Sequence, residues 1–256
     1  MPRRVVSLCP SITETVVAIG GLSRLAAATR YCVRPKGLLW GLPRIGGTKT
    51  PDIERIFDLE PDLVLANEEE NRREDVEALR ARGIEVDVTF PKRVVDVPPI
   101  VRRWGRLLSD ESFAEADALA ARIEALIAEL ERAPAARPFR FAYWIWKDPW
   151  MTVSDDTYVA DLLRFAGGVN VYGTEASRYP ATSPNEALAR SVEIQFFPSE
   201  PYPFRAEKHR ALAEKVFGTE AEFRFVAGDN YCWHGVRTLD GLSEMAVLRS
   251  NLEKND

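Results

Sequence analysis

ESFAEADALAARIEALIAELERA, at residues 111–133, is the one long uninterrupted helical pattern in this chain. It contains neither Gly nor Pro and consists almost wholly of strong helix formers. Its apolar residues recur at steps of three and four, which predicts a single stripe along one helix, formed by Phe113, Ala116, Leu119, Ile123, Leu126 and Leu130. With a rise of about 1.5 Å per residue, this helix would be roughly 35 Å long, about the width of a small domain. We therefore expect it to connect two lobes.

Strand and helix patterns alternate before residue 111 and again after residue 133. This alternation predicts an α/β fold with two lobes. We place an N-terminal α/β lobe at residues 1–110, the linking backbone helix at 111–133 and a C-terminal α/β lobe at 134–256. A chain of 256 residues with 46 % hydrophobic residues can give each lobe a core of its own.

Local signals set the expected elements within the lobes. Short apolar runs predict strands at residues 4–8, 25–28, 62–66, 84–90, 140–146, 150–153, 192–197 and 222–226. Amphipathic patterns predict helices over residues 52–59, 95–108, 205–217 and 239–252. Further helices are expected to start at caps formed by Ser11 and Asp155 and at residues 182–184, and one more is expected to end near Gly83. Ser11 and Glu14 have the spacing of a capping box. Segments 33–51 and 228–235 are expected to be loops.

Charge and cysteine content exclude several classes of protein. The net charge is −5 and the cations are scattered among acids, which disfavours nucleic-acid binding. No apolar run approaches the ~18 residues of a membrane span. Cys9, Cys32 and Cys232 have unrelated spacings, so they predict neither a disulfide framework nor a zinc motif, and they favour a reducing compartment. Because MPRR leads into VVSL without a signal peptide or lipobox, we expect a cytoplasmic protein as the sequence is written, and a periplasmic one if a signal sequence precedes it.

Aromatic residues are the main binding candidates at the predicted strand ends. They are Tyr31, Trp40, Trp146, Trp150, Tyr202, Tyr231 and Trp233. Aromatic faces supply much contact area to a large flat ring, and Arg30 and Lys147 could pair with its peripheral amides or carboxylates. For any single Trp, packing in the core is the alternative.

Other polar residues at strand ends are candidates too. Ser11 could cap its helix and also face a ligand, because backbone N–H groups point outward at that helix start. Asn67 follows the strand at 62–66 directly. Only two His are present, which argues against a protein-built Zn or Mn site. His209 is expected to be exposed, and His234 is either an ordinary loop residue or an axial ligand to a macrocycle metal.

An enzyme is the alternative from a different class of function. Cys9 precedes a predicted helix start, which could lower the pKa of its thiol, and Cys32 could lie nearby. No nucleophile elbow, P-loop, dinucleotide-binding turn or zinc-protease helix occurs in the sequence. We therefore predict a non-catalytic binding protein without an intrinsic cofactor or a bare metal ion.

Three stretches resemble the helical-backbone metal receptors, the substrate-binding proteins of ABC importers for cobalamin, haem and iron–siderophores. They are VVSLCPSITET at residues 5–15, the turn Arg30-Tyr31-Cys32, and IGGTKTPDIERIFDLEPDLVLANEEENRREDVEALRARGIEV at residues 45–86. The resemblance implies two lobes with mainly parallel sheets, a ligand cleft between them, and little closure because a rigid helix spans both.

The resemblance also implies a ligand and partners. The ligand would be cobalamin-like first, and otherwise haem or a ferric siderophore. One exposed acid on each lobe would dock on a permease that works with an ATPase; the candidates are Glu70, in the run Glu68 to Glu70, and Glu200. We expect a monomer. A cytoplasmic corrinoid or haem carrier or sensor is the alternative.

Overall fold

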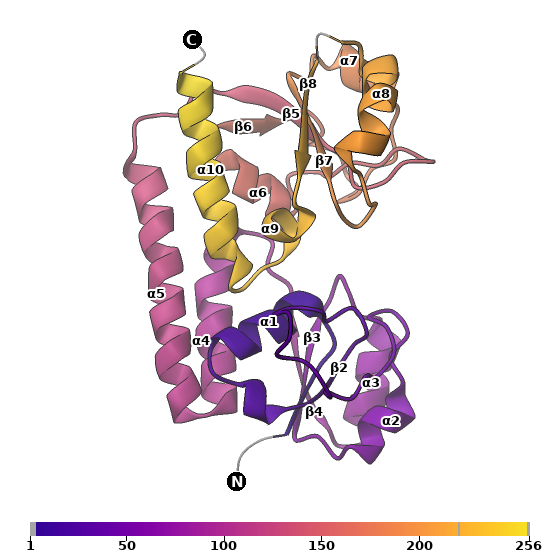
Figure 1. Ribbon diagram of the computed structural model, residues 1–256, viewed down its shortest axis with the longest axis vertical. Helices are drawn as coiled ribbons and strands as arrows, with labels where there is room; N and C mark the ends of the chain where they lie inside the picture. Colours follow the sequence, from indigo (N-terminus) through magenta and orange to yellow (C-terminus); the bar gives the residue numbers. More distant parts are fainter. Residues whose placement is uncertain (1–3, 220, 255–256) are drawn as a thin grey trace. The chain divides into compact units, whose positions relative to one another are not determined.

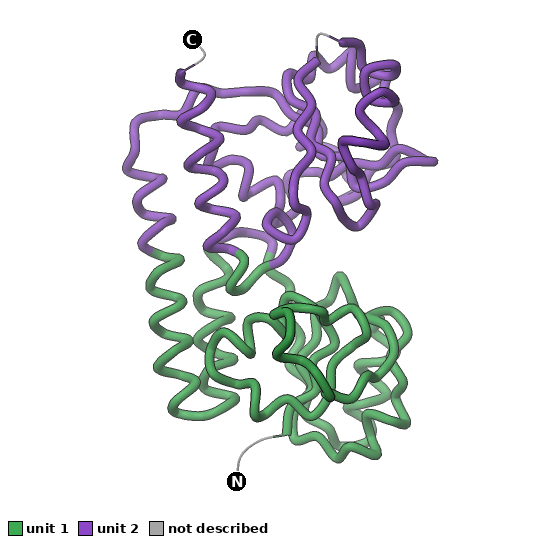
Figure 2. The backbone as a smooth tube through the Cα atoms, in the orientation of Figure 1, with its two compact units in different colours: residues 1–91, 95–124, 234–237 green, residues 92–94, 125–233, 238–256 purple. Residues whose placement is uncertain are grey.

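The computed structural model describes residues 4–219 and 221–254. Its strands form two four-stranded sheets, and every pairing within each sheet is parallel (Figure 1). The chain divides into two compact units (Figure 2). The first unit comprises residues 1–91, 95–124 and 234–237, and the second comprises 92–94, 125–233 and 238–256. The predicted class of two α/β lobes with a long helix is confirmed; the lobe boundaries stay a prediction.

The first sheet has the strand order β2-β1-β3-β4. Its strands are β1 (Val5–Ser7), β2 (Leu25–Ala28), β3 (Leu63–Asn67) and β4 (Glu85–Thr89). The helices in this part of the chain are α1 (Pro10–Ala18), α2 (Ile53–Asp58), α3 (Arg73–Ala81) and α4 (Val97–Leu108), with 3-10 turns at Leu22–Arg24 and Val94–Asp96. All residues of the two central strands, β1 and β3, are buried, as expected of a parallel sheet covered on both faces.

The second sheet has the strand order β6-β5-β7-β8. Its strands are β5 (Phe139–Tyr143), β6 (Gly168–Asn170), β7 (Ile194–Pro198) and β8 (Glu222–Val226). The helices that follow β5 in the chain are α6 (Tyr158–Arg164), α7 (Pro184–Ala189), α8 (Ala206–Phe217), α9 (Gly228–Cys232) and α10 (Arg237–Glu253). The core of this unit is aromatic. Trp144, Phe197, Phe204 and Phe217 are almost fully buried and pack ring against ring.

Helix α5 (Asp110–Arg132) confirms the predicted long helix to within one residue at each end. The boundary between the two units falls inside it, after Glu124 (Figure 2). The buried stripe differs from the predicted one, because Phe113 and Leu126 are only half-buried while Ala120 and Ile127 are buried. Leu126 and Ile127 show the reason. Both lie within one turn of the buried Ile123, so packing rather than spacing decides which of them faces the core.

Two predicted helix caps are wrong. Helix α1 begins at Pro10 with Cys9 as N-cap, because a proline ring fixes the backbone angle that the first helical position needs. Ser11 therefore lies inside the first turn and makes no capping bond. Helix α6 is capped by Thr157 instead of Asp155: the Thr157 Oγ1 accepts a hydrogen bond from the Ala160 N–H at 3.4 Å.

Two further expectations fail in the second half of the chain, and one strand was not expected. The strand expected at 150–153 is reduced to single bridges from Met151 to Trp146 and Ala181. The loop expected at 228–235 contains helix α9. Strand β6 was not predicted, because a three-residue strand that starts at Gly168 carries no periodic pattern.

Candidate ligand-binding site

The carboxyl ends of parallel strands meet at one edge of a sheet, and open α/β sheets bind ligands at that edge. Each sheet of this protein has such an edge. In the first unit the edge carries residues 8–11 after β1, 29–32 after β2 and 68–71 after β3. In the second unit it carries 144–147 after β5 and 199–202 after β7. Six of the ten predicted ligand-binding residues lie in these segments, and Asn67 ends β3 itself. The other three, Trp150, Trp233 and His234, lie outside them.

Arg30 and Tyr31 form an aromatic and cationic pair at the first edge. The Arg30 Nη2 donates to the Tyr31 Oη at 3.2 Å, and the guanidinium carbon lies 5.1 Å from the ring centroid. The Tyr31 side chain is 51 % exposed. A Cβ at Gly47 would lie 3.2 Å from the Tyr31 ring and 3.3 Å from the Arg30 Nη2, so glycine lets the pair lie close against this loop. The structure thus brings together two predicted residues and one that sequence reasoning missed.

The thiols near this edge are buried. Cys9 and Cys32 are 4 % and 0 % exposed, and the Thr13 Oγ1 donates to the Cys32 Sγ at 3.0 Å. Burial raises the pKa of Cys9 to about 12, and the negative charge of Glu70 acts in the same direction. The expected lowering of the thiol pKa by the helix start is therefore wrong. Burial thus disfavours the thiolate form of Cys9, which is the reactive form of a thiol.

Ser11 is also buried, at 3 % exposure. Its Oγ lies 3.3 Å from the Cys9 Sγ, and its carbonyl oxygen accepts a hydrogen bond from the Thr15 Oγ1 at 2.8 Å. The side chain thus contacts the interior of the first unit. Burial opposes the predicted contact between Ser11 and a ligand.

Asn67 shapes the acidic turn after β3. Its side-chain oxygen accepts hydrogen bonds from the backbone N–H groups of Glu69 at 2.9 Å and Glu70 at 3.3 Å. Asn71, which sequence reasoning missed, fixes the other side of the turn by accepting from the Asn67 N–H at 2.9 Å. The repeat of Asn at positions 67 and 71 was the available signal. Because of this turn, Glu68 and Glu70 are exposed at the edge.

The protein around Glu70 shifts the pKa of its carboxyl group, although the side chain as a whole is exposed. Desolvation raises the pKa of its carboxyl group, the charge of Lys49 opposes this effect, and the charge of Glu69 adds to it. The Lys49 Nζ also donates to the Glu69 carbonyl oxygen. The acidic run is thus partly balanced by one cation.

At the second edge, Trp146 is the most exposed of the predicted aromatics. Its side chain is 42 % exposed and meets Tyr202 edge-on, with 5.4 Å between ring centroids. Tyr202 in turn packs against Phe204 at 4.5 Å. Trp150 lies deeper and stacks on Phe204, so it belongs to the margin of the aromatic core. Lys147 pairs with the neighbouring Asp148, so an acid already neutralises its charge.

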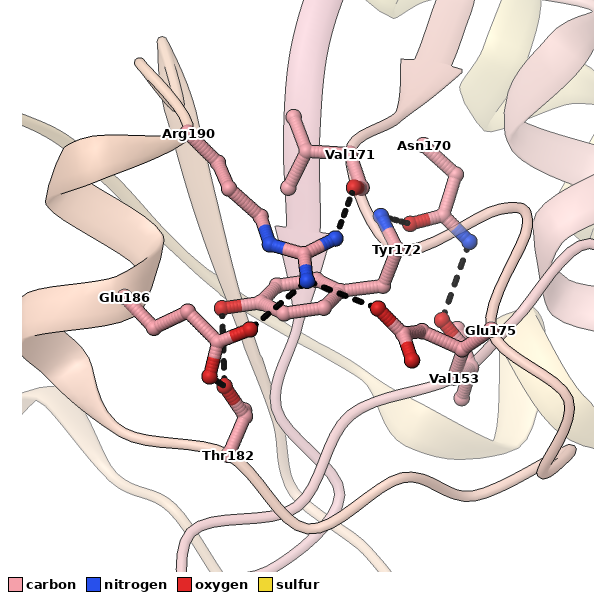
Figure 3. A network of polar contacts seen from close by, with 8 residues as sticks. All are labelled: Val153, Asn170, Val171, Tyr172, Glu175, Thr182, Glu186 and Arg190. Carbon is pink, nitrogen blue, oxygen red and sulfur yellow. Dashed lines mark hydrogen bonds and ion pairs between the residues drawn. The ribbon is translucent and has the colours of Figure 1, made fainter.

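A polar network holds the segment after β6 (Figure 3). The guanidinium carbon of Arg190 lies 4.5 Å from the centroid of the Tyr172 ring. Its Nη2 donates to Glu175 at 2.7 Å and to Glu186 at 2.6 Å, and its Nη1 donates to the Val171 carbonyl at 2.8 Å. Two acids therefore balance this cation. The network fixes the connection between β6 and α7, and its cation is already paired.

The remaining predicted residues lie around α9. Trp233 is half-buried at the end of α9, and Glu200 is half-buried with its Oε1 3.5 Å from the Cys232 Sγ. His234 belongs to the first unit and is only 5 % exposed, against Trp104 with 5.9 Å between ring centroids. Burial lowers the pKa of His234 to about 4 and opposes the predicted contact with a macrocycle. His209 is half-buried, and its Nδ1 accepts a hydrogen bond from the Arg205 N–H at 3.0 Å.

Two properties of the described residues concern metal binding and membrane spanning. Within 4–219 and 221–254, no three His, Cys, Asp or Glu side chains gather as ligands for a metal ion. Over the same residues, no helix has both the length and the apolar character that crossing a membrane requires.

Two parallel α/β units and a long helix, with aromatic residues at the carboxyl edge of each sheet, are the architecture of a two-lobed binding protein. The model of the periplasmic binding protein family matches residues 5–220 of the chain. The chain therefore belongs to this family, among its helical-backbone metal receptors.

Relatives and solved structures agree with this assignment. The chain is 28 % identical to a vitamin B12-binding protein of Vibrio parahaemolyticus over 196 residues, which cover 76 % of this chain and 70 % of the relative. Its fold is similar to the crystal structure of the periplasmic vitamin B12-binding protein of Vibrio cholerae, with a TM-score of 0.83, 21 % identity, and coverage of 99 % and 98 % of the two chains. It is also similar to a periplasmic haem-binding protein from Roseiflexus, with a TM-score of 0.80, 21 % identity, and coverage of 98 % and 99 %.

Proposed function

We propose that this protein binds a chelated metal or a metal macrocycle as the substrate-binding component of an ABC importer. The ligand is cobalamin-like first, and otherwise haem or a ferric siderophore. The observation that carries the proposal is the match to vitamin B12-binding relatives over three quarters of the chain. The exposed aromatic side chains at the two sheet edges support it.

Each edge has the chemistry that such a ligand needs. At the first edge, Tyr31 offers an exposed ring and Arg30 a guanidinium for an acidic or amide group. At the second edge, Trp146 offers a second exposed ring, and Tyr202 holds it from the side. These residues supply contact area and hydrogen bonds, and none of them supplies a reacting group. The chemistry is reversible binding.

Titration of the purified protein with cyanocobalamin, haemin and a ferric siderophore tests the proposal. We expect one of the three to bind, with heat in a calorimetric titration and, for the coloured ligands, a shift in the absorbance spectrum. If none of the three binds, the proposed function is wrong.

Replacing Trp146 with Ala should weaken binding of that ligand about thirtyfold or more. Truncating an exposed aromatic anchor typically costs about 2 kcal/mol, which corresponds to this factor. Trp233→Ala should also weaken binding, because its ring is predicted to contact the ligand. Phe57→Ala is the control, because it removes an aromatic ring that is 44 % exposed on α2, away from the edges. Unchanged affinity in both Trp variants would assign those rings to structure alone.

We also propose that Glu70 and Glu200 dock on the permease. Both follow strands that end at the ligand-binding edges, and charges at the rim of an interface act mainly on association rate. Glu70→Lys and Glu200→Lys should slow association with the purified permease and ATPase about tenfold at low salt. Ligand affinity should not change. Glu74→Lys is the matched control on α3, and an equal loss in all three variants would contradict the docking role.

A further inference from the structure

The segment after β2 presents an apolar tip to solvent. We name residues 33–43 the tryptophan loop. Trp40 is 91 % exposed, Val33 60 % and Leu38 54 %. Leu39, between the two outward residues of the tip, is only 4 % exposed. Alternate residues of the tip thus point into the protein and out of it, and the outward ones are apolar.

The tip is shaped by two glycines. Gly37 and Gly41 flank Leu38 to Trp40, and both have φ in the left-handed region, at 83° and 76°. Only glycine adopts such angles without strain, so the turn is set by the sequence GLLWG. The exposure of Trp40 is therefore a property of a defined turn.

Arg44 anchors the loop from inside. Its Nη1 donates to the carbonyl oxygens of Thr29 at 3.1 Å and Cys32 at 2.8 Å, and its Nη2 donates to that of Leu39 at 3.4 Å. A β-bridge also joins Arg44 to Ala28 at the end of β2. Three charge-assisted hydrogen bonds and a bridge fix the base and the tip of the loop. The loop is therefore built to hold its apolar residues outward.

The charged residues in the sequence around the loop are all cationic. Residues 15–51 contain no Asp or Glu, although the chain has 39 acidic residues. The cations of this stretch are Arg24, Arg30, Arg34, Lys36, Arg44 and Lys49. Arg34 and Lys36 are the nearest to the tip in sequence, and Lys36 is exposed. Because salt screens exposed charges beyond about 8 Å, these local cations decide what approaches the tip, and the net charge of −5 does not.

We propose that the tryptophan loop docks this protein on an anionic lipid surface. Trp40 and Leu38 enter the boundary between headgroups and acyl chains, where Trp is favoured, and Lys36 and Arg34 meet the anionic headgroups. Ligand sites are concave, whereas Trp40 is 91 % exposed, so the tip suits a flat surface better than a small ligand. Large exposed apolar side chains beside cations are instead the composition of an interfacial anchor.

Vesicle binding tests the proposal and needs no ligand, so it is independent of the proposed function. Sedimentation with vesicles of phosphatidylcholine mixed with phosphatidylglycerol should carry the protein down, and vesicles of phosphatidylcholine alone should carry down much less. The difference spectrum between the wild type and Trp40→Phe isolates the fluorescence of Trp40. We expect it to shift to shorter wavelength with the anionic vesicles.

Three variants assign the effect to the loop. Trp40→Ser should remove most of the sedimentation, and Lys36→Gln should weaken vesicle binding about fivefold, the factor expected for one cation near an anionic membrane. Lys208→Gln, an exposed cation on α8, is the control and should bind as the wild type does. Circular dichroism checks that each variant is folded. We expect all three to fold, because the replaced side chains are exposed.

Three outcomes would overturn the proposal. They are equal binding of Trp40→Ser and the wild type, equal binding of Lys36→Gln and Lys208→Gln, and no shift of the Trp40 fluorescence on anionic vesicles. A Trp40 shift caused by haemin or cyanocobalamin without vesicles, together with no vesicle binding, would assign the loop to the ligand. Capture of the loop by the permease alone would assign it to a protein partner.

Discussion

Lowering the pH from 7 to 4 is expected to remove about 3 kcal/mol of stability from the first unit through one residue, His234. Burial lowers the pKa of His234 from an ordinary value of 6.5 to about 4. Between pH 6.5 and 4, His234 is protonated in the unfolded chain but neutral in the folded chain. The free energy of unfolding therefore falls as the pH falls. Above pH 6.5 both states are neutral and the effect vanishes. A difference of about 2.5 pKa units corresponds to about 3 kcal/mol.

Within the described residues, the Nε2 atom of His234 has no partner that would relieve this penalty. The ring packs against Trp104. Glu14, on the helix beside this segment, is paired with Arg237. A protonated imidazole would therefore hold a buried Nε2–H without a hydrogen-bond partner.

Urea denaturation of the wild type and of His234→Gln at a series of pH values measures the effect. Exposed carboxylates titrate in both proteins, so their contribution cancels in the difference. The free energy of unfolding of the wild type minus that of the variant should decrease steadily as the pH falls from 6.5 to 4. Parallel curves for the two proteins would contradict the assignment.

Replacing Arg237 with Ala is expected to cost about 3–5 kcal/mol in the first unit. The Arg237 Nε and Nη2 donate to the two carboxylate oxygens of Glu14 at 2.8 and 2.7 Å. The two side chains are only 15 % and 11 % exposed. Removing the cation leaves the Glu14 carboxylate poorly hydrated and without its partner. This uncompensated charge accounts for most of the free energy lost when such a pair is broken.

Two further variants separate this cost from ordinary surface effects. Arg73→Ala breaks the exposed pair with Glu77 on α3 and should cost no more than about 0.5 kcal/mol. The double variant Arg237→Met with Glu14→Gln should recover most of the loss, because it leaves no uncompensated charge. Hydrogen exchange of the α1 amides reports the change directly. Equal protection in Arg237→Ala and Arg73→Ala would refute the role of the pair.

Local sequence determined most of the elements of this protein. The long helix, strand β2, strand β8 and the helices that start near Asp52 and Ser183 were all readable, because the interactions that form them lie within a few residues. The acidic turn at the end of β3 was placed for the same reason. At the candidate site, the sequence predicted Arg30 and Tyr31 as neighbours after the strand at 25–28, and the ring of Tyr31 is exposed; their contact with a ligand stays a prediction.

Only the tertiary structure decided which side chains at those edges are accessible. Trp144 and Trp146 are two residues apart, yet one is fully buried in the aromatic core and the other is 42 % exposed. His234 looked like a loop residue, and its burial depends on Trp104, 130 positions earlier in the chain. The partner of Arg237 is 223 residues away. Burial and ion pairing depend on neighbours that a local pattern does not contain, so only the folded chain fixes them.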